Sequence, residues 1–132
     1  MHLRNSRSDI QMLLEEWSRW RRLGHGANIG YPSQSAFVRV SKMGGWATKI
    51  PLITDEQAGR VDLAVSRLKL KCIKGDLRWE VLTDRYLGGK SDSVIARRLR
   101  VDRRTVATAR KAAESWVESY IDSEVFHTHN AY

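Results

Sequence analysis

The segment from Asp92 to Lys111, DSVIARRLRVDRRTVATARK, constrains the fold of this chain more than any other stretch. Two short helical patterns meet there, around residues 99–102. The apolar residues have the offsets that let two helices pack at a steep angle, at Ile95, Ala96, Leu99, Val101, Val106 and Ala109. The outward positions carry arginine, threonine and lysine, which can reach base edges and phosphates in the major groove of DNA. We therefore predict a helix-turn-helix that binds double-stranded DNA.

Positive charge is concentrated in the same segment. The chain of 132 residues has 23 lysines and arginines against 15 aspartates and glutamates, which gives a net charge of +8. Between Arg97 and Lys111, seven cations stand against one anion, Asp102. A helix face that is merely solvated usually mixes both signs. The charge distribution therefore favours a polyanionic partner.

Apolar residues at helical spacing also predict an all-α fold for the rest of the chain. Its length suits one core, so we expect a single small helical domain over 1–132. The first helix is expected over 8–23. Trp17 and Trp20 lie on its apolar stripe and are predicted to be core residues.

Further helices are expected along the C-terminal two thirds. A helix is predicted over 54–74, because Thr54 and Gln57 have the spacing of a capping box. The helix-turn-helix module is predicted over 76–121, with a long last helix that begins at Arg103. A frayed tail is expected over 122–132, where neither capping nor periodic signals are found.

The stretch over 24–53 breaks the helical pattern with glycines, serines and isolated aromatic residues. We expect a glycine-rich irregular arm there, since connections longer than about 12–15 residues without regular structure tend to be functional or disordered. Two interpretations stay open. The arm packs over the helices, or it contacts polymerase or RNA through Arg39, Lys42, Trp46 and Lys49.

The directions of the side chains in the predicted motif assign a role to each candidate. Outward positions of the last helix are predicted to face bases, and these are Arg103, Arg104, Thr105, Thr108 and Lys111. Among them Arg104 and Thr108, one turn apart, are the preferred base-edge contacts. The preceding helix crosses the sugar-phosphate backbone in this geometry, so phosphates are assigned to Lys90, Ser91, Arg97 and Arg98.

Signals for enzymatic chemistry are weak, and we expect neither catalysis nor a cofactor. Cys72 is the sole cysteine, so an internal disulfide and a multi-cysteine zinc site are excluded. His127 and His129 lack a third ligand in the predicted tail, so a metal site is not expected. Apolar runs are too short to cross a bilayer and no signal peptide is recognisable, so we expect a cytoplasmic protein with no membrane partner.

Several separate segments together resemble a known family. These are the stretches DIQMLLEEWSRW, GYPSQSAF, DEQAGRVDLAVSRLK and YLGGKSDSVIARRLRVDRRTVATARKAAESWVESYI, which are similar to those of the phage antitermination protein Q family. The resemblance covers most of 8–121. It implies a factor that binds a DNA element near a phage late promoter, engages paused bacterial RNA polymerase and enters a complex that reads through terminators.

The same resemblance leaves several partners and functions open. A sigma factor, nascent RNA and a second copy of the chain on DNA are further partners to test. A repressor or activator with the same motif would act only at initiation. A small terminase-like packaging protein also joins a helix-turn-helix to helices, and it would be expected to form rings.

Overall fold

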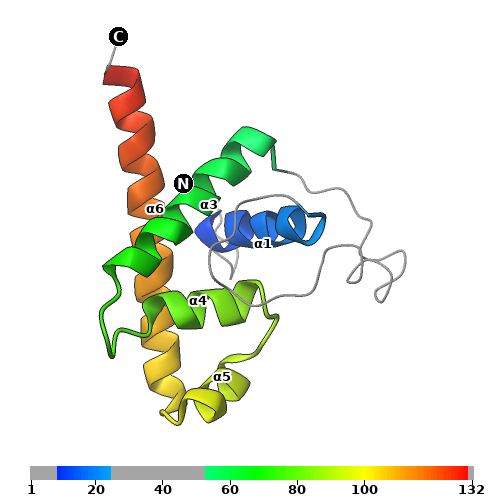
Figure 1. The fold of residues 1–132 in the computed structure, drawn as a ribbon, viewed down its shortest axis with the longest axis vertical. Helices are drawn as coiled ribbons and strands as arrows, with labels where there is room; N and C mark the ends of the chain where they lie inside the picture. Colours follow the sequence, from blue (N-terminus) through cyan, green and yellow to red (C-terminus); the bar gives the residue numbers. More distant parts are fainter. Residues whose placement is uncertain (1–8, 25–52, 131–132) are drawn as a thin grey trace, which may run out of the picture. The chain divides into compact units, whose positions relative to one another are not determined.

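The computed structural model describes residues 9–24 and 53–130, with side chains up to 123. The helices of this part are α1 (Asp9–Arg22), α3 (Asp55–Lys71), α4 (Arg78–Tyr86), α5 (Asp92–Leu99) and α6 (Arg103–Asn130) (Figure 1). The described residues contain no strand, so the predicted all-α class is confirmed. No helix among them has the length and apolar character that a membrane span requires.

The chain divides into two compact units, which cover 1–62 and 63–132. The boundary falls inside α3, so the beginning of this helix belongs to the first unit and its end to the second. That both units form one domain stays a prediction from the sequence.

In the first unit, the two tryptophans of α1 bind the N-terminal half of α3 through hydrogen bonds. Trp17 is completely buried, and its indole Nε1 donates a hydrogen bond of 3.1 Å to Oδ1 of Asp62. Arg21 Nη1 donates to the same oxygen over 2.5 Å, and Trp20 Nε1 donates to Asp55 Oδ1 over 2.9 Å. Both tryptophans are therefore core residues, as the apolar stripe predicts.

The helix α3 begins as predicted and ends before the predicted boundary. Thr54 and Gln57 form the capping box, because each backbone N–H donates to the other side chain over 3.1 Å. The helix ends at Lys71, three residues before the predicted end at 74. The chain turns there instead, with Gly75 at a φ of 91°, a conformation that glycine adopts readily.

In the second unit, α4 and α5 pack against α6, as Figure 1 shows in its lower part. The core consists of Val81 from α4, Ile95 and Ala96 from α5, and Val106 from α6. Around it pack four partly buried residues, Leu77, Leu99, Val101 and Ala109. All six apolar positions of the sequence motif thus lie in or against this core.

The last helix is longer than predicted. α6 runs to Asn130, whereas the sequence predicts an end at Ile121 and a frayed tail over 122–132. The segment DSEVFHTHN over 122–130 contains neither glycine nor proline, so no residue in it interrupts the helical hydrogen bonds. Residues 131–132 lie outside the described part.

A partly buried polar network links all three helices of this core. Tyr86 of α4 donates its hydroxyl proton to Glu114 Oε2 of α6 over 2.7 Å. Arg110 donates to the same oxygen over 3.2 Å and to both oxygens of Asp92, at the start of α5, over 3.3 Å. Burial, followed by the hydrogen bond to Glu114, raises the pKa of Tyr86 well above its usual value. The tyrosine therefore stays protonated and donates.

Replacement of this tyrosine tests the network. We expect Tyr86→Phe to lower the free energy of unfolding by about 1 kcal/mol at neutral pH, because one buried hydrogen bond is lost. The raised pKa means that the folded state holds this proton more tightly than the unfolded state does. The contribution is therefore complete below about pH 10 and falls above it. Urea denaturation at neutral pH and above pH 10 should show that the difference in unfolding free energy between wild type and Tyr86→Phe is smaller at the higher pH. An equal difference at the two pH values would contradict this.

Candidate nucleic-acid interface

The connection between α5 and α6 is a three-residue turn with defined hydrogen bonds. Ser91 caps α5, since its side chain accepts from the N–H of Val94 over 3.3 Å. Arg100 ends the helix in a left-handed conformation, with φ 60° and ψ 44°, and its N–H donates to the carbonyl of Ala96. The N–H of Val101 donates to the same carbonyl over 3.0 Å. This turn sets the direction in which α6 leaves α5.

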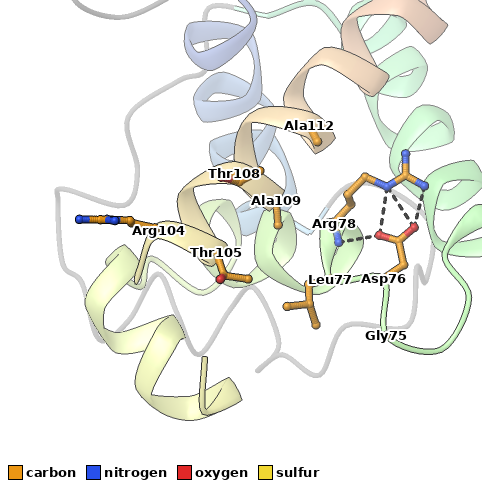
Figure 2. Close-up of a pocket in the computed structure, with 9 residues that line it drawn as sticks. All are labelled: Gly75, Asp76, Leu77, Arg78, Arg104, Thr105, Thr108, Ala109 and Ala112. Atoms are coloured by element: carbon orange, nitrogen blue, oxygen red, sulfur yellow. Dashed lines mark hydrogen bonds and ion pairs between the residues drawn. The ribbon is translucent and has the colours of Figure 1, made fainter. Parts of the chain in front are cut away.

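The predicted base-contact residues share the exposed side of the first turns of α6. The structure places all five of them there, with exposed side chains, at Arg103, Arg104, Thr105, Thr108 and Lys111. Arg104 and Thr108 are four residues apart, so they lie one above the other on the helix. Arg104 extends away from Asp76 and Arg78 (Figure 2). Val106 faces inward and is completely buried.

Most cations of the motif have no carboxylate partner in the described part of the chain. Arg103 makes one weak contact, from Nη1 to Ser93 Oγ over 3.4 Å. The cations that form no ion pair among the described residues are Arg97, Arg100, Arg103, Arg104 and Lys111. They give the helix pair a concentrated positive face that can attract a polyanion.

Two of the residues predicted to contact phosphate, Arg98 and Lys90, form ion pairs with carboxylates of the protein. Arg98 Nε donates to Asp84 Oδ2 over 2.8 Å, and its Nη2 lies 3.3 Å from Glu80 Oε2. Lys90 Nζ lies 3.6 Å from Asp84 Oδ1, and the Asp84 side chain is only 4% exposed. Both cations keep exposed surface, so their contact with phosphate stays a prediction, but each also ties the α5 region to α4.

The carboxylates that bind these cations were not predicted from the sequence. A signal was present, because Asp84 falls between the apolar residues Leu82 and Tyr86 of the predicted helix. A charged residue in such a position is expected to be paired. Arg110 likewise differs from the other cations of the motif, because Asp92 and Glu114 bind it.

A hollow of about 440 Å³ opens beside the predicted base-contact face. One wall is the segment from Gly75 to Arg78, and the other is α6 with Arg104, Thr105 and Thr108 (Figure 2). The first wall is braced by Asp76, whose carboxylate accepts from the backbone N–H of Arg78 over 3.1 Å and from its guanidinium over 2.8–3.1 Å. The hydrogen bond from the Arg78 side chain holds the pKa of Asp76 below its usual value.

The predicted arm falls outside the described part of the chain, apart from its first and last residues. Residues 25–52 lie outside the described part of the chain. They include all four residues proposed for polymerase or RNA contact, Arg39, Lys42, Trp46 and Lys49.

Comparison with known proteins identifies the family of this chain. The family model for phage antitermination protein Q matches residues 7–125. The chain belongs to this family. Searches among curated proteins and among solved structures gave no match.

Membership in the antitermination protein Q family gives the general role. The protein is a bacteriophage factor of transcription antitermination, and an antiterminator acts on RNA polymerase. The matched range includes every residue of the three-helix core around α5 and α6.

Proposed function

We propose that this antiterminator binds a DNA element near the phage late promoter and loads from there onto paused RNA polymerase, which then reads through terminators. The observation that carries the DNA step is the exposed face of α6. Five cations without an ion-pair partner in the described part lie on α5, on the turn and on α6, next to two threonine hydroxyls. In this proposal, α5 and α6 act as a helix-turn-helix with α6 in the major groove.

Each side chain has a distinct part in the proposed complex. Arg104 offers two parallel N–H donors, which suit the O6 and N7 acceptors of guanine. Thr108, one turn further, is placed for a neighbouring base. Arg97 and Ser91 on the α5 side would hold phosphates, with Lys90 and Arg98 adding charge from their carboxylate-bound positions. Arg103, Thr105 and Lys111 complete the contact surface.

The second step transfers the protein to polymerase in the cytoplasm of the bacterial host. The DNA element brings the factor close to a polymerase that has paused shortly after the promoter. The arm residues Arg39, Lys42, Trp46 and Lys49 are proposed to contact polymerase or nascent RNA. A sigma factor in the paused complex, and a second copy of the chain on DNA, are compatible with this order of events.

A transcription assay in vitro tests the proposed function. The template carries the phage late promoter, the adjacent DNA element and a terminator downstream, and it is transcribed by the host polymerase holoenzyme. We expect the protein to raise the fraction of transcripts that pass the terminator several-fold. Scrambling the DNA element should remove the effect, because loading then fails, and raising the salt should weaken it, because phosphate contacts release counterions.

The same assay separates the alternatives. A repressor or activator of initiation would change the total number of transcripts and leave the fraction that passes the terminator unchanged. That result would refute the antitermination mechanism for this protein. A packaging protein would affect neither quantity, and light scattering would detect its rings.

A further inference from the structure

The C-terminal half of α3 and the turn after it expose an unusual amount of apolar surface. Leu63 is 43% exposed, and Leu70 and Ile73 are each 78% exposed. Leu63 and Leu70 are two helical turns apart, so they lie on one face of α3. Ile73 lies in the turn after α3. This turn is closed by a hydrogen bond of 2.9 Å from the N–H of Asp76 to the carbonyl of Ile73.

The fold does not require these side chains. The opposite face of α3 already carries the buried residues of this helix, among them Ala58, Val61, Val65 and Leu68, each with no exposed surface. One apolar face is enough to pack a helix of a globular protein. Large apolar side chains that gather on the other face mark an interaction surface.

Three exposed cations accompany this apolar surface. Arg67, Lys71 and Lys74 are exposed, and within the described residues none of them forms an ion pair. Lys69 is different, because its Nζ lies 4.9 Å from the centre of the Trp79 ring. We call the group of Leu63, Arg67, Leu70, Lys71, Ile73 and Lys74 the α3 stripe.

The chemistry of the α3 stripe restricts its partner. Nucleic acid would satisfy the cations but offers no pocket in which Leu70 and Ile73 could be buried. A second copy of this chain would bring further positive charge, since each copy carries a net charge of +8. A protein surface with acidic residues around an apolar pocket matches both properties of the stripe.

We infer that the α3 stripe is the docking surface by which this antiterminator binds an acidic, apolar patch of RNA polymerase. The inference rests on the proposed function for the identity of the partner. Leu70 and Ile73 provide the apolar anchors, and Arg67, Lys71 and Lys74 form the charged rim. The stripe is separate in sequence from the proposed DNA contacts, which begin at Lys90, so DNA and polymerase can be bound by different residues.

Two double variants of the full chain test this surface. Leu70→Ser with Ile73→Ser removes the apolar anchors. Arg67→Glu with Lys71→Glu reverses the charge of two of the three rim residues. All four positions are exposed, so the fold is retained, which circular dichroism verifies. The matched controls are Met12→Ser, another exposed apolar position at 46%, and Arg85→Glu, an exposed cation of α4. Affinity is measured with purified host polymerase holoenzyme and, separately, with a duplex carrying the DNA element.

We expect the apolar double variant to bind polymerase at least tenfold more weakly, because burial of each large aliphatic side chain stabilises a complex by about a tenfold factor or more. The rim variant should bind more weakly as well, with a stronger effect at low salt. Both should keep wild-type affinity for the duplex and lose terminator readthrough, whereas the controls behave as wild type.

Other results would overturn the inference in distinguishable ways. If wild-type protein reads through and the apolar variant does so equally well, the α3 stripe is not the docking surface and the proposed function stands. If wild-type protein shows no readthrough at all, the proposed function itself fails. If the rim variant loses binding to a single-stranded RNA probe and the apolar variant keeps it, RNA is the occupant of the stripe. If the wild-type protein is a dimer and Leu70→Ser with Ile73→Ser dissociates it, the occupant is a second copy of the chain.

Discussion

Arg104→Ala is expected to remove sequence-specific DNA binding and to leave most of the non-specific affinity. Arg104 is exposed near the start of α6, and no carboxylate of the described part pairs with it. An arginine that binds one guanine through two hydrogen bonds contributes about 1–3 kcal/mol of discrimination. We therefore expect binding to the specific duplex to weaken about 10- to 100-fold. Fluorescence anisotropy measures this with a duplex selected from random sequences and with a scrambled duplex.

The matched control for Arg104 is Arg97→Ala. Arg97 is an exposed cation of α5 that also forms no ion pair in the described part, and it is assigned to phosphate. Its removal should weaken specific and scrambled duplexes by the same factor. Lys90→Ala should do so too, although it also removes a charge beside Asp84, 3.6 Å away. Equal losses on both duplexes for Arg104→Ala and Arg97→Ala would refute the division into base and phosphate contacts.

Trp17→Ala is expected to be strongly destabilising, because Trp17 is the largest fully buried side chain among the described residues. The side chain is completely buried and its indole N–H is bound to Asp62. Truncation of a buried tryptophan leaves a large cavity and costs about 3–5 kcal/mol. Chemical denaturation followed by circular dichroism should show the unfolding transition at a much lower urea concentration than in wild type.

Trp17→Phe separates packing from hydrogen bonding at the same position. Phenylalanine fills most of the space and lacks the donor, so about 1–3 kcal/mol should be lost. Asp62 keeps its bond from Arg21, which limits the loss. If Trp17→Ala left the unfolding transition unchanged, the assignment of α1 to the core of the first unit would be wrong.

The regular parts of this fold could be predicted because local sequence patterns, namely apolar spacing and helix caps, indicate them. Thr54 with Gln57, and the stripe from Ile95 to Ala109, are local patterns whose partners lie within a few residues or on the next helix. The same holds for the exposed side of α6, because the buried position of Val106 decides which neighbours point outward. These parts of the candidate interface were therefore visible in the sequence.

Features that depend on residues far apart in the chain were not predictable. The pairing of Arg98 with Asp84 spans 14 positions, and that of Tyr86 with Glu114 spans 28. No local pattern indicates which cation a buried carboxylate selects. The hollow beside Arg104 likewise depends on residues far apart in the chain, since its opposite wall is the segment from Gly75 to Arg78. The end of α6 was misjudged because a helix without breakers continues even where no apolar periodicity marks it.

The carboxylates of Asp84 and Glu114 have a consequence for the free protein. Like charges crowded on α5, the turn and α6 repel one another, and without compensation this repulsion would push the helices apart. Asp84 and Glu114 act as internal counterions for Arg98 and Arg110. The Asp84–Arg98 pair joins α4 to α5, and Arg110, which Glu114 binds within α6, also pairs with Asp92 at the start of α5. The interface is thus preorganised, and little conformational entropy needs to be lost when a ligand binds.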